Sequence, residues 1–180
     1  MGIQIEDGLG RGFLAQVDSE GHFVVDALTL SDMAHTSEEH GQSFTWSSGT
    51  YDPAAADTIL LVKNTSTTLP LFIKGISLSA DVDTRVIIHI PTTEVTPTGT
   101  AITGTNLNST SNNAASATAI RDETNNSQGN IVWSGEIQAA GDPYFVETFG
   151  AIIIGQNDSI GIDFVADVAV CDVVIYGYFD

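Results

Sequence analysis

The sequence contains few basic residues. Five Lys and Arg stand against 23 Asp and Glu, which gives a formal net charge of −18 at pH 7. Binding to nucleic-acid phosphates and to anionic membrane surfaces depends on basic side chains. We therefore expect neither nucleic acid nor a membrane as a partner. A charge of this size also keeps copies apart unless cations or a basic partner surface offset it.

Cysteine is almost absent. Cys171 is the only one, so the chain cannot form an intramolecular disulfide. Its place in the apolar run Val168–Ile175 predicts a buried side chain that packs as a small hydrophobe. The sequence also lacks an apolar run of about 18 residues and a basic segment followed by an apolar one at its start. These absences predict a chain without a membrane helix or a secretion signal.

Catalytic signatures are missing as well. No Gly-x-Ser-x-Gly elbow occurs, and the glycine-rich Gly8–Gly12 lacks the Lys-Ser/Thr of a phosphate-binding loop. His22 and His89 fall in expected strands and are interpreted as structural or surface histidines. The sequence therefore predicts no catalytic residue and no cofactor, and we do not expect an enzyme.

What is present is a pattern of short β-rich runs separated by turn residues. Counting from Gln42 gives about eight strands, enough for an antiparallel sandwich of two sheets. The fold class predicted is all-β, a jelly-roll-like antiparallel β-sandwich with an extended N-terminal arm. Residues 1–41 would form the arm and a linker, and residues 42–180 the sandwich.

The end of the sequence carries the strongest strand pattern. In Ser159–Val165 the larger apolar residues alternate with Gly161 and Asp163, which is typical of a half-buried strand. The β-branched run Val168–Phe179 is expected inside a sheet. Residues 91–130, by contrast, are rich in Thr, Ser and Asn, and predict a long surface connection with one short strand or helical turn near Ala114–Ile120.

The arm has several apolar residues but too little sequence to bury them alone. We expect them to pack on another copy or on a partner surface, and the oligomer expected is a homotrimer. The candidate interface residues are Ile3, Ile5, Phe13, Leu14 and Val17.

Potential metal ligands are densest in Ser31–Gly41, the one expected short helix. The order His35, Glu38, Glu39, His40 misses the zincin pattern by one residue. The five-residue spacing from His35 to His40 would place the imidazoles on different faces of an α-helix. We therefore interpret the segment as a solvated polar linker and predict no metal site.

Acidic turns offer oxygen ligands for calcium, but none follows the Asp-x-Asp-x-Asp-Gly loop. They are interpreted as solvated. Trp46 and Trp133 are interpreted as core or interface residues rather than as a sugar site. The acidic candidates are Asp81, Asp83, Asp122, Glu123, Asp158, Asp163 and Asp167.

Four stretches together resemble a family of small virion structural proteins of tailed phages. They are Ile5-Glu6-Asp7-Gly8-x-Gly10-x-Gly12 with Ala15, Val17 and Asp18; Leu61–Asn64 followed by Leu69–Leu71; the loop from Asn106 to Ala119; and Gly150–Gly155 with Asp158 and Ser159. The resemblance implies a capsid decoration (cement) protein on the outer capsid surface, bound to the major capsid protein in many copies. A head- or tail-fibre component that binds a host receptor or glycan remains the alternative.

Overall fold

The structure is a computed structural model. It describes residues 4–5, 13–14, 16–17, 23–24, 32–53, 58–90, 93–94, 98–123, 126–127, 129–139 and 143–180. The chain divides into two compact units, Met1–Leu30 and Ser31–Asp180. Within the described ranges, no helix has the length and apolar character needed to cross a membrane.

The first unit contains two short antiparallel ribbons. β1 (Gln4–Ile5) pairs with β2 (Phe13–Leu14), and β3 (Gln16–Val17) pairs with β4 (Phe23–Val24).

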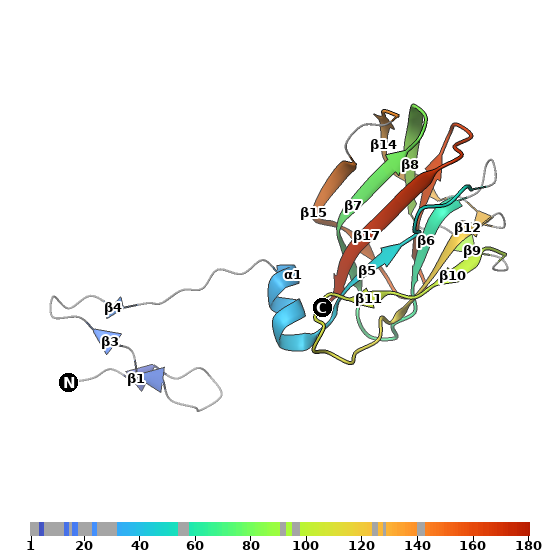
Figure 1. Cartoon of the computed structure of the whole chain (residues 1–180). Helices are drawn as coiled ribbons and strands as arrows, with labels where there is room; N and C mark the ends of the chain where they lie inside the picture. Colours follow the sequence, from blue (N-terminus) through green and yellow to red (C-terminus); the bar gives the residue numbers. More distant parts are fainter. Residues whose placement is uncertain are drawn as a thin grey trace. The chain divides into compact units, whose positions relative to one another are not determined.

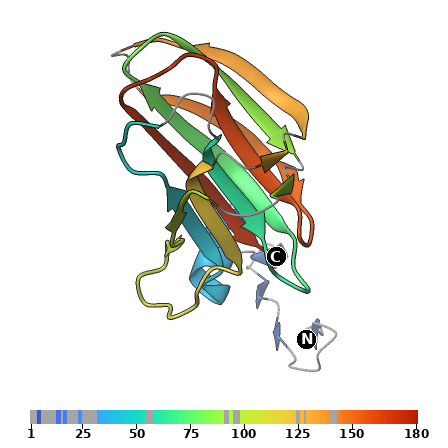
Figure 2. The same ribbon diagram turned by 90° about the vertical axis from the view of Figure 1, so that its right-hand side faces the viewer.

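The second unit is a sandwich of two antiparallel sheets, so the predicted all-β sandwich is confirmed (Figure 1 and Figure 2). The six-stranded sheet has the order β10 (Thr100–Ile102), β12 (Ala117–Glu123), β6 (Thr58–Asn64), β16 (Ser159–Phe164), β8 (Thr84–Ile90), β14 (Asn130–Ile137). The five-stranded sheet has the order β11 (Thr105–Asn106), β5 (Ser43–Ser47), β17 (Cys171–Phe179), β7 (Leu71–Ala80), β15 (Tyr144–Ile154). A separate ribbon pairs β9 (Thr93–Glu94) with β13 (Asn126–Ser127).

Alternation of apolar residues along the strands builds the core between the sheets. In β17, Cys171, Val173 and Ile175 are buried while the residues between them are only partly covered. Ile160 and Ile162 of β16 face this layer from the other sheet. The expectation that the run ending at Phe179 lies inside a sheet is confirmed, because β17 has β5 on one side and β7 on the other.

Successive strands change sheets almost every time. β5, β7, β15 and β17 belong to the five-stranded sheet, and β6, β8, β14 and β16 to the six-stranded one. The exception is the connection from β8 to β14, which joins two strands of the same sheet and contains β9 to β13. Strands that pair are therefore usually distant in the sequence.

Two expectations about strands were wrong. β16 is buried along all six residues rather than half-buried. It lies between β6 and β8, and Asp163 on its outer face is covered as well as its core face. Residues 91–130 contain the expected strand near Ala114–Ile120, which is β12, but they contain four further described strands as well. β12 pairs along β6 and buries Ala119 and Ile120, so this segment is not only a surface connection.

The helical segment belongs to the second unit, which therefore begins at Ser31 rather than at the predicted Gln42. It consists of α1 (Asp32–His35) followed by a π-helical turn, η1 (Thr36–His40). Gly41 ends it in the left-handed conformation, with φ of 59°, which glycine adopts without steric cost. The expected short helix closed by Gly41 is thus confirmed.

Candidate assembly surface

The outer side of the five-stranded sheet carries aromatic residues from three strands. Directly paired residues of antiparallel strands share one face of a sheet. One row across the strands contains Ile153, Phe72 and Tyr178. A second row across the strands places Tyr176 opposite Gly75. We define Phe72, Phe145, Ile153, Tyr176 and Tyr178 as the aromatic face.

The rings of the aromatic face contact one another across the strands. Phe72 and Tyr178 stack with centroids 5.1 Å apart and planes 10° apart. Phe145 lies 6.1 Å from Tyr176 and covers Gly75, where an added Cβ would come within 2.3 Å of Phe145 Cζ. The absence of a side chain at Gly75 therefore leaves the space that the Phe145 ring occupies.

Two side chains of the aromatic face project into solvent. Phe145 is 54 % exposed and Ile153 is 51 % exposed. Isolated exposed apolar residues are ordinary, but apolar residues that gather on one face mark a contact surface. Both come from β15, the last strand of its sheet.

The exposed apolar side chains continue onto the neighbouring sheet edge. β14 ends the six-stranded sheet on this side, and its Trp133 lies 6.0 Å from Tyr144 of β15. Ile131 and Val132 of β14 are exposed. The opposite edges are the much shorter β10 and β11.

β14 and β15 are edge strands with one glutamate each and one irregularity in register each, between Ile131 and Trp133 in β14 and between Glu147 and Ile152 in β15. Both lack Lys and Pro, which proteins place on edge strands to prevent pairing with another chain. β15 is also eleven residues long. The combination of an open edge and an apolar face is suited to binding another protein chain by strand addition and apolar burial.

A hollow of about 320 Å³ lies beside this edge. Tyr144, Glu136 and Gln138 line it, together with Leu78, Ser79, Ala80 and Ile137. An aromatic ring beside a carboxylate and an amide is a chemistry that fits a polar ligand such as a sugar. A second hollow, of about 390 Å³, is lined by ten residues of which none is aromatic or charged.

The histidine expected to be structural, His89, is buried. Its Nε2 lies 2.8 Å from Oδ2 of Asp163, so this aspartate is an ion-pair partner and not a solvated turn residue as predicted. Both side chains are at most 10 % exposed. Of the other acidic candidates, Asp83 accepts a hydrogen bond from Ala139 N at 2.7 Å.

Cys171 is buried, as predicted, with 1 % of its surface exposed. Burial, together with the carboxylates of Asp172 and Asp81, raises the pKa of its thiol to about 12. Tyr51 pairs with Cys171 through the backbone and donates its hydroxyl to Ile59 O at 2.7 Å. Burial also raises the pKa of Tyr51, and Arg121 lies over its ring at 4.8 Å. The thiol is therefore not a nucleophile at neutral pH.

The tryptophans hold the positions expected of core residues. Trp46 is fully buried beside Phe44, and Trp133 is partly buried against the core. Of the candidate arm residues, Ile5 pairs with Phe13, Leu14 with Gln4, and Val17 with Phe23. Ile3 lies outside the described residues.

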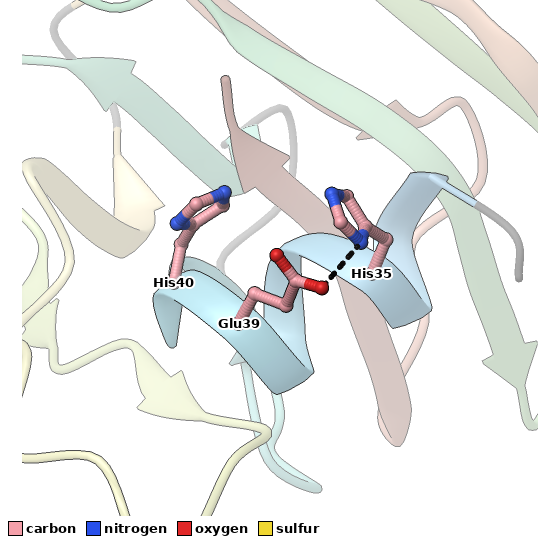
Figure 3. A group of neighbouring side chains, drawn as sticks. All are labelled: His35, Glu39 and His40. Carbon is pink, nitrogen blue, oxygen red and sulfur yellow. Dashed lines mark ion pairs between the residues drawn. The ribbon is translucent and has the colours of Figure 1, made fainter. Parts of the chain in front are cut away.

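The expectation that His35 and His40 lie on different faces was wrong. Their ring centroids are 5.8 Å apart, and with Glu39 they form a cluster whose ligand atoms lie within 4.8 Å of one another. Figure 3 shows the three side chains projecting from the same side of the helical segment. Within the described residues this is the only such group of three.

Sequence reasoning missed the aromatic face, although part of the signal was present. Asp172, Val174, Tyr176 and Tyr178 alternate with the core residues of β17 and so had to share its outer face. Neither Phe72 nor Phe145 could be joined to them without the strand register. Comparisons with protein-family models, with curated proteins and with solved structures find no match to this chain.

Proposed function

We propose that the protein is a non-catalytic virion component that decorates and reinforces the outer surface of a tailed-phage capsid. The observation that carries the proposal is the aromatic face together with the open edge of β15. A decoration protein needs a surface that binds neighbouring subunits, and it needs no catalytic group or cofactor. The resemblance of the sequence to small virion proteins supports the same role.

The strand order supports a jelly roll, which is the architecture we propose for the sandwich. Its central four-stranded sets are β5-β17-β7-β15 and β6-β16-β8-β14. A jelly roll consists of eight strands folded as two Greek keys, and virus capsid domains use it. On this assignment β9 to β13 are an insertion between the fourth and fifth strands.

The charge supports an outer location. A net charge of −18 is repelled by packaged DNA and favours a surface that faces away from it. The proposed partners are two further copies of the chain, forming a homotrimer, and the major capsid protein. Many such contacts on one particle act together, so a modest affinity per site holds the shell.

Cryo-electron microscopy of the virion that carries the chain tests this role. We expect density for the sandwich on the outside of the head, at three-fold and quasi-three-fold positions. Density confined to a tail tip or to projecting fibres would exclude decoration.

The second candidate function is receptor or glycan binding by a head or tail fibre. The hollow beside Tyr144, Glu136 and Gln138 is the observation that favours it. A Tyr144→Ala variant would then lose binding to host cells, while a Val165→Ala variant, whose exposed side chain does not line the hollow, would keep it. If the full chain binds neither host cells nor their surface glycans, this candidate is excluded.

A further inference from the structure

The exposed cluster of His35, Glu39 and His40 has the composition of a transition-metal site. Two imidazoles and one carboxylate are ligands that Zn²⁺ binds, whereas Ca²⁺ and Mg²⁺ prefer oxygen alone. All three side chains are open to solvent, so an ion can reach them. The cluster lies away from the core and has no part in the assembly surface.

The π-helical turn is what brings the histidines together. In an α-helix, residues five apart point in directions about 140° apart, because each residue turns the chain by 100°. A π-turn closes over five residues, so residues i and i+5 lie one above the other. Thr36–His40 adopts this turn, and His40 therefore lies next to His35.

Part of the coordination geometry already exists. His35 Nδ1 lies 3.5 Å from Glu39 Oε1. Two ligand atoms of a tetrahedral zinc ion, each about 2.0 to 2.1 Å from the metal, are about 3.4 Å apart. This pair thus has the required spacing, and only the His40 ring has to approach.

Distant asparagines hold the turn in place. Asn108 Nδ2 donates to Ser37 O at 2.8 Å, and Asn113 Nδ2 donates to His40 O at 2.9 Å. Asn106 Nδ2 donates to Gly41 O at 2.8 Å. Carbonyls at the end of a helix have few partners within it, and here three asparagines between residues 106 and 113 donate to them, in addition to the bond from Gly41 N to Ser37 O. The backbone that carries the ligands is therefore fixed before any metal binds.

We propose that His35, Glu39 and His40 form a three-ligand site for Zn²⁺ or a similar divalent transition metal, with water in the fourth position. The acidic chain raises the local concentration of cations around the site. The proposal is independent of the capsid role, because it rests on the helical segment alone.

The test uses the full chain without a histidine tag. Isothermal titration with Zn²⁺ should show one ion per chain, and Co²⁺ should give the absorption bands of a tetrahedral complex. An excess of Ca²⁺ or Mg²⁺ should not displace either ion. Loss of even an outer-shell partner costs about 10- to 100-fold in metal affinity, so His40→Ala and Glu39→Gln should each weaken binding by about tenfold or more.

Glu38→Gln is the matched control, because Glu38 is a neighbouring exposed carboxylate outside the cluster. Its affinity for Zn²⁺ should equal that of the wild type. Each variant is also melted thermally to show that it is folded. Absence of saturable one-to-one binding by the wild type would overturn the proposal. So would unchanged binding by folded Glu39→Gln and His40→Ala, or an equal loss in Glu38→Gln.

Discussion

Replacing Phe145 by Thr should weaken self-association without unfolding the sandwich. Phe145 is 54 % exposed on the aromatic face, and Thr keeps a β-branched side chain on the strand. A Phe side chain has about 200 Å² of surface, so about 110 Å² remains available for burial against another copy. At about 25 cal/mol per Å², this area represents about 2.7 kcal/mol.

Ordering the side chain at an interface costs about 0.5 to 1.5 kcal/mol, which leaves about 2 kcal/mol per interface. A cyclic trimer has three such interfaces, so the variant loses about 6 kcal/mol in the free energy of assembly. The dissociation constant of a trimer into three monomers has units of concentration squared. The loss of about 6 kcal/mol should therefore raise the concentration at which half of the trimer is dissociated by about a hundredfold.

Sedimentation equilibrium over a concentration series, at physiological salt, measures this change. Val165→Thr is the matched control, since Val165 is 63 % exposed and lies outside the aromatic face. Urea unfolding of both variants reports any loss of fold stability. An unchanged trimer in Phe145→Thr, or an equal loss in Val165→Thr, would refute the assignment of this surface.

Three further predictions concern the arm, the buried ion pair and the thiol. Deleting residues 1–30 should leave the unfolding temperature of the remaining unit unchanged while weakening its attachment to the particle. A pull-down with capsids measures the attachment, and attachment as strong as that of the full chain would show that the arm is not part of the interface. His89→Ala should lower the free energy of unfolding by about 3 to 5 kcal/mol, because the buried Asp163 carboxylate loses the imidazole that lies 2.8 Å from it. A loss below about 1 kcal/mol in urea titration would contradict this. The raised pKa of Cys171, about 12, means that the folded state favours the neutral thiol. The thiol's contribution to stability should therefore be fully present below the unfolded thiol's pKa, about 9, and be lost as the pH rises from there toward 12. A disulfide reagent at pH 8 should modify Cys171 only after unfolding.

The features that the sequence predicted are those that depend on near neighbours. Alternation placed β16, and the β-branched run Val168–Phe179 placed β17. The turn between β15 and β16 has Asn157 in a left-handed conformation, with φ of 63°. Asparagine tolerates this conformation better than most residues. Burial of Cys171 followed from the apolar residues on either side of it.

The features that it missed depend on contacts between distant segments. The π-turn is held by Asn108 and Asn113, about seventy residues away, so a helix period of 3.6 gave the wrong relation between His35 and His40. On the outer face of β16, Asp163 is buried beside His89 of β8, a contact that strand alternation alone does not reveal. The aromatic face requires the register of β15, β7 and β17, which local patterns do not encode.

The central place of β17 has a consequence for biosynthesis. β5 and β7 both pair with β17 and not with each other, so their sheet stays open until residues 171–179 have left the ribosome. Until then Leu71 and Ile76 have no completed layer to cover them. The sandwich therefore folds late. During translation the growing chain exposes apolar strand edges. A ribosome that stops before Cys171 releases a chain that cannot close its core, which makes every truncated product a substrate for chaperones and proteases.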